Sequence, residues 1–308
     1  MSVQTIPRVI TIGETMALVA PARAESLATA QDLRLHAGGA ESNVASHLAE
    51  IGVTSAWVSA VGDDVLGRRI VRSVERHGVD IRWVSFDAAA PTGVYFKDPG
   101  RGVLYYRRGS AASRMSPATV ANIPLEAAEV VHLSGITPAL SESCAALVED
   151  VVERVGGSNA TSNVILSFDV NHRQALWADG VASAALSSLA NRADLVFVGL
   201  DEAHALWGCD SADDVRALLP LPERLVVKDG SVGATEFTGG VSVFAPAIPT
   251  DVVEAVGAGD AFAAGYLAAL LRGETALDRL RCGHERARLV LLSTSDFIGE
   301  STTTTGKA

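Results

Sequence analysis

The chain alternates short apolar runs with longer segments of helical periodicity over most of its 308 residues. The first apolar run covers 9–12, and a helical pattern over 42–51 follows it, in which Ser42 or a neighbour could cap the helix. Further strand-like and helix-like segments alternate at 55–61, 66–77, 129–134, 142–155, 163–169, 181–192, 194–198, 224–228 and 258–272. This alternation predicts a mostly parallel sheet with helices on both faces.

Two stretches depart from the alternation. Residues 16–36 and 91–108 carry short alternating strands without helices, so we expect them to pair with each other as a small β lid. The polar tail 301–308 is predicted to be disordered, which leaves a single α/β domain over 1–300.

Composition limits the possible partners. Hydrophobic residues make up 48% of the chain and the net charge is −11, which allows a full core and argues against nucleic acid or an anionic membrane as a partner. An anionic substrate must therefore be held by local positive groups. Arginine is plentiful, whereas lysine occurs only at Lys97, Lys228 and Lys307.

The cysteines and the N-terminus indicate a cytoplasmic protein. Cys144, Cys209 and Cys282 lie far apart and form no CxxC pair, which favours reduced thiols over disulfides or a zinc site. We see no signal peptide and no apolar stretch of about 18 residues that could cross a membrane.

The strongest chemical motif is Gly257-Ala258-Gly259-Asp260, which opens the helical segment at 258. Glycines let the backbone approach a bound anion closely, and a helix N-terminus presents unpaired N–H groups and partial positive charge to it. Asp260 would lie beside that anion as a base able to take a proton from an attacking hydroxyl group. The motif predicts phosphoryl transfer to an alcohol.

Polar clusters follow two other predicted elements, in the region where open parallel sheets bind ligands. The Gly38-Gly39 pair allows close backbone approach, and Asn43 offers a donor and an acceptor to sugar hydroxyls, although a tight turn before a helix explains the glycines equally well. Segment 169–173 ends in Arg173, a candidate fork for a carboxylate or phosphate, with a solvated loop charge as the alternative.

The lid carries its own candidates. Tyr105 and Arg107 lie on one side of their predicted strand, and Tyr106 and Arg108 lie on the other. One of these sides should face the cleft and pair with Tyr95 of the neighbouring strand. Ordinary cross-strand packing is the alternative.

The last cluster is the strand end at Lys228 with the spaced Gly230 and Gly233, a turn suited to lie along a nucleotide phosphate tail. A plain β-hairpin explains the same glycine spacing. The chain has no P-loop, no GxGxxG fingerprint, no GxSxG elbow and no HExxH motif.

Together these segments resemble the ribokinase-like sugar kinase family over nearly the whole chain. The resemblance rests on 38–45, 61–67, 78–80 and 256–262. It implies a ribokinase-like three-layer αβα sandwich with a mostly parallel central sheet and a small β-sheet lid. Within the family, 105–113 and 169–177 are most similar to the 2-keto-3-deoxygluconate kinases.

The resemblance implies an ATP-dependent kinase that phosphorylates the terminal hydroxyl of 2-keto-3-deoxygluconate. Asp260 is then the general base, and the backbone amides of Gly257, Ala258 and Gly259 form the anion hole. The implied sugar-acid ligands are Tyr95, Tyr105, Arg107 and Arg173, in addition to Gly38, Gly39 and Asn43. Two arginines suit a substrate that bears a carboxylate and a transferred phosphate, whereas a neutral sugar needs less positive charge.

The same resemblance implies the cofactors. Lys228, Gly230 and Gly233 should line the ATP site together with the glycines of the anion hole, and Asp296 should lie near substrate or nucleotide. Mg²⁺ would bridge the ATP phosphates largely through water, with Glu202 as an indirect ligand in place of the family's Asn-x-x-Glu motif. Glu254-Ala255 stands where many members have Asp-Thr, which weakens the case for a monovalent-cation site.

Two other functions remain open. One is a kinase of a neutral sugar such as fructose, or of a nucleoside, and the other is a non-catalytic sugar-binding or regulatory protein on the same fold. The exposed edges of the lid also suggest a homodimer formed through it.

Overall fold

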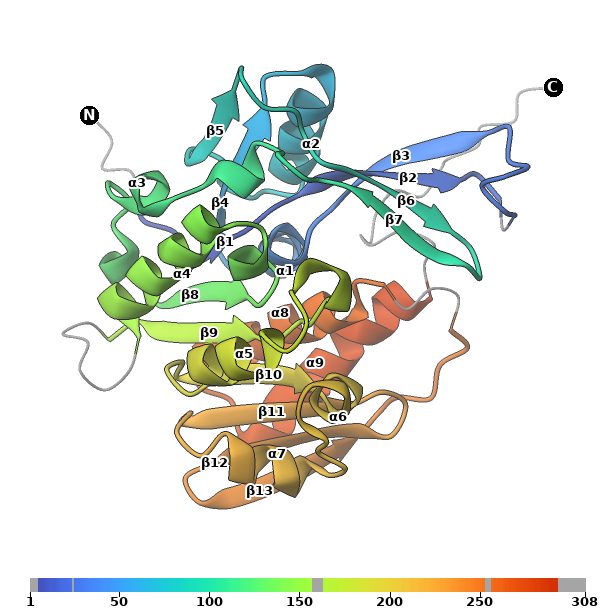
Figure 1. Ribbon diagram of the computed structural model, residues 1–308. Coiled ribbons are helices and arrows are strands. Elements are labelled where there is room, and N and C mark those ends of the chain that lie inside the picture. The colour runs from blue at the N-terminus through green and yellow to red at the C-terminus, as the bar shows by residue number, and fades with distance from the viewer. Residues whose placement is uncertain (1–4, 24, 157–162, 253–255, 293–308) are drawn as a thin grey trace.

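The computed structural model describes residues 5–23, 25–156, 163–252 and 256–292. Over these residues the main sheet has the strand order β13-β12-β11-β10-β9-β8-β1-β4-β5 (Figure 1). Its strands are β1 (Val9–Ile12), β4 (Ser55–Gly62), β5 (Val84–Asp87), β8 (Val130–Ser134), β9 (Ile165–Asp169), β10 (Leu195–Gly199), β11 (Arg224–Asp229), β12 (Gly233–Thr238) and β13 (Val241–Pro246). All neighbours pair in parallel from β11 to β5, and β12 and β13 continue the sheet in antiparallel fashion.

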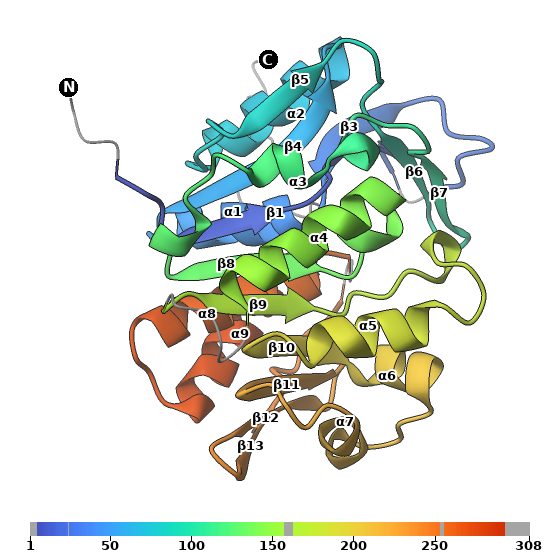
Figure 2. The same ribbon diagram turned by 60° about the vertical axis from the view of Figure 1, so that its left-hand side comes forward.

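Helices cover both faces of this sheet (Figure 2). One face carries α3 (Pro117–Val120), α4 (Glu142–Val155), α5 (Ala182–Ala190), α6 (Leu200–Trp207) and α7 (Ala212–Leu218). The other carries α1 (Ala40–Glu50), α2 (Val65–Arg76), α8 (Ala258–Leu271) and α9 (Ala276–Leu291). Short 3-10 turns lie at Ala112–Arg114, Leu125–Ala127, Thr137–Ala139 and Gln174–Leu176. The predicted αβα sandwich is confirmed.

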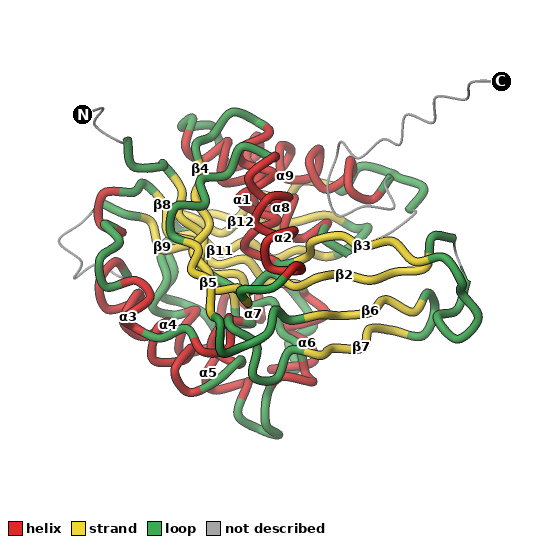
Figure 3. The backbone as a smooth tube through the Cα atoms, turned by 90° about the horizontal axis from the view of Figure 1, so that it is seen from above, coloured by secondary structure: helices red, strands yellow, loops and turns green. Residues whose placement is uncertain are grey.

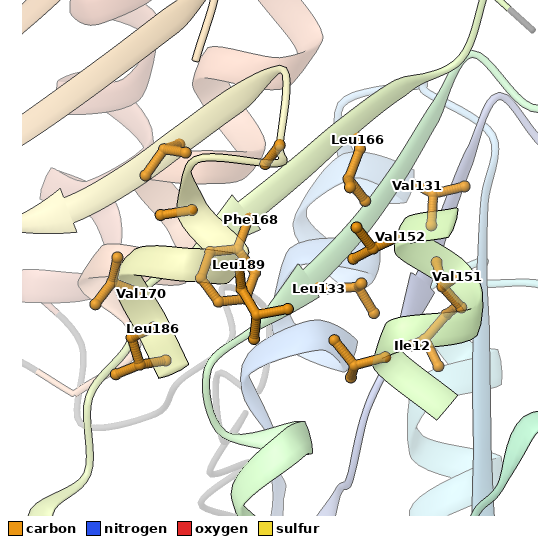
Figure 4. Packing of buried hydrophobic residues seen from close by; sticks show 14 of the residues in the cluster. Ile12, Val131, Leu133, Val151, Val152, Leu166, Phe168, Val170, Leu186 and Leu189 are labelled. Carbon is orange, nitrogen blue, oxygen red and sulfur yellow. The ribbon is translucent and has the colours of Figure 1, made fainter. Parts of the chain in front are cut away.

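The central strands are apolar along their whole length because both of their faces are covered. Every residue of β4, β8 and β10 is buried. Figure 4 shows one side of this core, where Ile12 of β1 lies beside Val151 of α4 and Phe168 of β9 lies beside Leu189 of α5. Truncation of a buried phenylalanine such as Phe168 to alanine typically costs about 3–5 kcal/mol.

The predicted lid is also confirmed. It consists of β2 (Met16–Pro21), β3 (Leu33–Gly38), β6 (Val94–Asp98) and β7 (Gly102–Tyr106), in the order β3-β2-β6-β7. Strand β2 pairs antiparallel with β3 and parallel with β6, and β7 pairs antiparallel with β6. Seen from above, the four strands extend away from the body of the molecule (Figure 3).

Several local expectations need correction. Helix α1 begins at Ala40, and its N-cap is Gly39, so the predicted cap by Ser42 is wrong. Ser42 lies inside the helix, where its hydroxyl donates to the Gly39 carbonyl and accepts from Thr15. The predictions also omitted β5, β12, β13, α6, α7 and α9.

The glycine-spaced turn after Lys228 joins the antiparallel strands β11 and β12, as the hairpin alternative predicted. Three predictions lie outside the described residues: the tail 301–308, Asp296, and the Glu254-Ala255 departure. Among the helices that the structure describes, none is long and apolar enough to span a membrane.

Candidate active site

A cleft of about 790 Å³ lies where the lid meets the C-terminal strand ends of the main sheet and the start of α8. Elements from the whole chain contribute to its wall. All candidates that the structure describes line this one cleft: Gly38, Gly39, Asn43, Tyr95, Tyr105, Arg107, Arg173, Glu202, Lys228, Gly230, Gly233, Gly257, Ala258, Gly259 and Asp260. The cleft thus brings together candidates that lie far apart in the sequence, such as Gly38 and Asp260.

The glycine motif forms the N-terminus of α8. Gly257 is the N-cap with φ of +85°, a left-handed conformation that favours glycine over every other residue. Ala258, Gly259 and Asp260 form the first helical turn, whose N–H groups have no partners within the helix. The turn therefore offers backbone donors and partial positive charge to an anion in the cleft.

The Asp260 carboxyl group is held by an amide from another helix. Asn43 Nδ2 of α1 donates to Asp260 Oδ2 at 2.8 Å. Burial raises the pKa of Asp260 to about 7, and the charge of Asp169 adds to this, whereas the Asn43 hydrogen bond and the charges of Arg173 and Lys228 act in the opposite direction. A carboxyl group that titrates near neutral pH suits a general base.

Lys228 provides a fixed positive charge beneath the first turn of α8. Its Nζ donates to Asp169 Oδ2 at 2.9 Å, and a Cβ atom on Gly259 would lie 3.5 Å from that nitrogen. Burial works to lower the pKa of Lys228, but the charges of Asp169 and Glu202 outweigh it, so the pKa is raised. The ammonium group therefore stays protonated close to Asp260.

Glu202 and Arg173 form a looser pair on the far wall. Glu202 Oε2 accepts from the Gly199 backbone N–H at 3.0 Å, and Oε1 lies 3.6 Å from Arg173 Nη1. Burial raises the pKa of Glu202, and the charge of Asp169 raises it further. The Arg173 side chain is 46% exposed, so it can turn toward a ligand.

No group of three or more His, Cys, Asp or Glu side chains is arranged to hold a metal ion within the ranges that the structure describes. A directly ligated metal cage does not fit these residues. The neighbouring carboxylates of Glu202 and Asp169 instead fit a cation that keeps its water shell.

The lid wall is aromatic. Tyr95 and Tyr105 are paired across β6 and β7, and their rings stack with centroids 5.8 Å apart, as expected if both side chains face the cleft. Gly38 lies directly beneath them, because a Cβ atom there would come within 2.0 Å of the Tyr95 hydroxyl oxygen. Arg107 follows β7 and is buried. Its guanidinium pairs with the carboxylate of Glu14, which lies in the connection between β1 and β2.

Two further polar residues line the cleft: Glu14, which sequence reasoning missed, and Asn171, which belongs to the predicted cluster 169–173. Glu14 is buried and accepts from Arg107 Nε at 2.7 Å. Asn171 has a φ of +37°, and its buried Oδ1 has no hydrogen-bond partner among the described residues. Both residues follow the C-terminal end of a parallel strand, where open sheets bind ligands, and that position was the signal available in the sequence.

Comparison with known proteins gives matches over most of the chain. Residues 7–302 match the model of the pfkB family carbohydrate kinases. The 2-dehydro-3-deoxygalactonokinase of Haloferax volcanii is 32% identical over 292 residues, which are 91% of this chain and 89% of that protein. The 2-dehydro-3-deoxygluconokinase of Bacillus subtilis is 32% identical over 301 residues, which are 94% of this chain and 91% of that protein.

Plant fructokinases match as well, at 28% to 31% identity. Among solved structures, a PfkB protein from Polaromonas sp. JS666 superimposes with a TM-score of 0.84 at 31% identity. That match covers 92% of this chain and 95% of the Polaromonas chain.

Proposed function

The chain belongs to the pfkB family of carbohydrate kinases, and from that premise we propose that it transfers the terminal phosphoryl group of ATP to the terminal hydroxyl group of a sugar acid. The proposed substrate is 2-keto-3-deoxygluconate and the product its 6-phosphate. One observation carries the proposal: Asp260 lies at the start of α8 in a cleft that also contains Arg107 and Arg173.

Asp260 is the proposed general base. Its pKa of about 7 lets it exist as a carboxylate at neutral pH and still accept a proton from the sugar hydroxyl. The backbone N–H groups of Gly257, Ala258 and Gly259 would stabilise the charge that develops on the transferred phosphoryl group. Asn43 holds one carboxylate oxygen, which leaves the other for the substrate hydroxyl.

The arginines support an acidic substrate. Arg107 follows a lid strand and Arg173 lies in the segment after β9, and both line the cleft, so both can contact a sugar acid bound there. A guanidinium group binds a carboxylate through two parallel hydrogen bonds. Stacked Tyr95 and Tyr105 offer an aromatic surface and hydroxyl groups to the same ligand.

The proposed ATP site lies at the β11–β12 turn. Gly230 and Gly233 have positive φ values of 44° and 154°, so the backbone there can approach the phosphates closely, with Lys228 beside them. Mg²⁺, when bound with ATP, neutralises phosphate oxygens. Glu202 would accept hydrogen bonds from the water molecules of that ion.

A fructokinase is the second candidate, and the comparisons give it support. Curated relatives named fructokinases match much of the chain.

A substrate panel tests the proposal. Purified protein is incubated with ATP and Mg²⁺ and with 2-keto-3-deoxygluconate, 2-keto-3-deoxygalactonate, fructose, ribose or adenosine, and phosphorylated products are detected by mass. We expect a kcat/KM for at least one sugar acid that exceeds that for fructose by tenfold or more, about 1.4 kcal/mol. Preferential turnover of fructose would favour the second candidate. Calorimetric sugar binding without ADP release would favour a non-catalytic protein.

We also infer a homodimer formed through the lid. Leu33, Leu104 and Tyr106 are large apolar side chains that are 50%, 54% and 66% exposed, and all three lie on the edge strands of the lid. A second copy would cover this surface. Light scattering of the wild-type protein should give twice the mass of one chain, and the Leu104→Glu variant should have the mass of a single chain. A cytoplasmic location follows from the proposed need for ATP and agrees with three unpaired cysteines.

A further inference from the structure

The carboxylate of Glu14 lies in the short connection between the two sheets. β1 ends at Ile12 and β2 begins at Met16, so Glu14 belongs to the segment where the chain leaves the main sheet for the lid. Its side chain is fully buried. Oε1 accepts from Ser110 Oγ at 2.6 Å, and Oε2 accepts from Arg107 Nε at 2.7 Å and forms an ion pair with Arg107 Nη2.

These contacts occupy the edge of the Arg107 guanidinium that carries Nε and Nη2, and they leave the edge with Nη1 open. Nε and Nη2 both bind Oε2 of Glu14, whereas Nη1 has no hydrogen-bond partner among the residues that the structure describes. Arg107 lines the cleft, so its remaining N–H groups are available to a ligand there. A carboxylate can bind this second edge without breaking the pair with Glu14.

The guanidinium has little room to move. The Tyr105 ring lies on one side, with its centroid 5.7 Å from Arg107 Cζ. On another side, a Cβ atom on Gly93 would lie 2.8 Å from Glu14 Oε1 and 3.5 Å from Arg107 Cβ. Arg173 differs, because it is 46% exposed and its nearest carboxylate contact is 3.6 Å. Of the two arginines proposed to bind the sugar acid, Arg107 is therefore the one held in place.

We propose that Glu14 is a positioning residue that acts through Arg107: it holds the guanidinium in the orientation that binds the carboxylate of the sugar acid. The inference rests on the proposed function. An arginine without this contact would lose side-chain conformational entropy when substrate binds, and that loss weakens binding. An arginine that Glu14 already holds does not pay this cost on binding. Glu14 should therefore lower the KM for the sugar acid and leave ATP binding unaffected.

A purely structural role for Glu14 is the competing explanation, since the residue also joins the lid to the main sheet. A double-mutant cycle separates the two. The variants are Glu14→Gln, Arg107→Ala and the combination, measured for kcat and for the KM of both substrates. Glu236→Gln is the matched control, because Glu236 is equally buried and paired with Arg279 but does not line the cleft.

We expect Glu14→Gln to raise the KM for the sugar acid about tenfold, with kcat and the KM for ATP changed less than about twofold. The double variant should be no worse than Arg107→Ala, since Glu14 acts only through that arginine. Glu236→Gln should lower the melting temperature and leave both KM values unchanged. If Glu14→Gln does not fold, Glu14→Asp is the second variant. It keeps the negative charge, but its shorter side chain lies farther from Arg107, so it should also raise the KM for the sugar acid.

Additive effects in the cycle, or an equal rise in the KM for ATP, would overturn this inference alone. Wild-type KM values in both Glu14 variants would do the same. A wild-type protein that phosphorylates no sugar acid at all would overturn the proposed function, and the inference with it.

Discussion

Asn43 and Asp260 are 217 residues apart in the chain, and a hydrogen bond of 2.8 Å joins their side chains. The bond links the N-terminal end of α1, which continues from the lid, to the N-terminal end of α8, which carries the anion-binding turn. The amide stabilises the charged form of Asp260, against burial, which favours the neutral form. Asn43 therefore tunes the proposed base and is also a proposed sugar ligand.

The pH dependence of turnover should report this contact. The acting form of Asp260 is the carboxylate and its pKa is about 7, so kcat/KM should rise as the pH increases through 7 and then level off. Asn43→Ala removes a donor that lowers this pKa, so its profile should shift to higher pH. Asn191→Ala, which removes an amide at the end of α5, is the control. Superimposable profiles for Asn43→Ala and wild type would refute the tuning role.

Asp260→Asn should lower activity and raise stability. Turnover should fall by about 10²-fold or more, because the base is lost. The raised pKa means that the folded state binds a proton more tightly than the unfolded state, so this carboxyl favours folding below about pH 4 and loses that contribution as the pH rises toward 7. At pH 8 the free energy of unfolding of the variant should therefore exceed that of wild type by about 1 kcal/mol or more, and its melting temperature should be higher. At pH 5 both differences should be smaller. Equal differences in melting temperature at the two pH values would contradict the pKa assignment.

Gly38→Ala should damage sugar binding selectively. The new Cβ would lie 2.0 Å from the Tyr95 hydroxyl oxygen, so Tyr95 must move, together with the Tyr105 ring stacked on it. We expect the KM for the sugar to rise about tenfold while the KM for ATP stays constant. Gly100→Ala in the lid hairpin is the control: its φ of +74° makes alanine strained, but nothing lies within 4 Å of the new atom. That control should lose a little stability, about 1 kcal/mol, and keep both KM values.

Arg173→Gln should separate acidic from neutral substrates. A hydrogen bond to a charged group is worth about 1.5–3 kcal/mol, so loss of the guanidinium should raise the KM for the sugar acid roughly tenfold or more. Any residual activity on fructose should change little. Arg192→Gln removes a similarly exposed arginine that pairs with Glu149, and it should leave the kinetics unchanged. An equal loss on acid and neutral sugars would argue against carboxylate recognition by Arg173.

The layered fold and the glycine-rich turns were predictable because their signals are local. The short apolar runs that form β4 and β8 are typical of strands buried on both faces, and the positive φ of Gly257 is required by the backbone of its own turn. The edge hairpin β12–β13 was missed, and its second strand differs from the central strands in that most of its residues are exposed.

The contacts inside the cleft were less accessible to sequence reasoning. Glu14 has no local signal beyond its place after β1, and its partners Arg107 and Ser110 lie 93 and 96 residues away. The pairing of Lys228 with Asp169 was missed for the same reason, since each residue alone resembles an ordinary strand-end charge. Such pairs depend on the order of strands in the sheet, which becomes known only from the structure.

The N-terminal strand pair of the lid is attached to the body at two junctions, and both are part of the cleft. Glu14 lies in the connection from β1 to β2, Gly38 is the last residue of β3, and Gly39 joins β3 to α1. Loop grafting at the hairpin tips would leave these junctions untouched and so should not transfer selectivity from one kinase to another. A chimera that exchanges both junctions and the segment of Arg107 as one cassette is the smallest replacement that carries the whole sugar-facing wall.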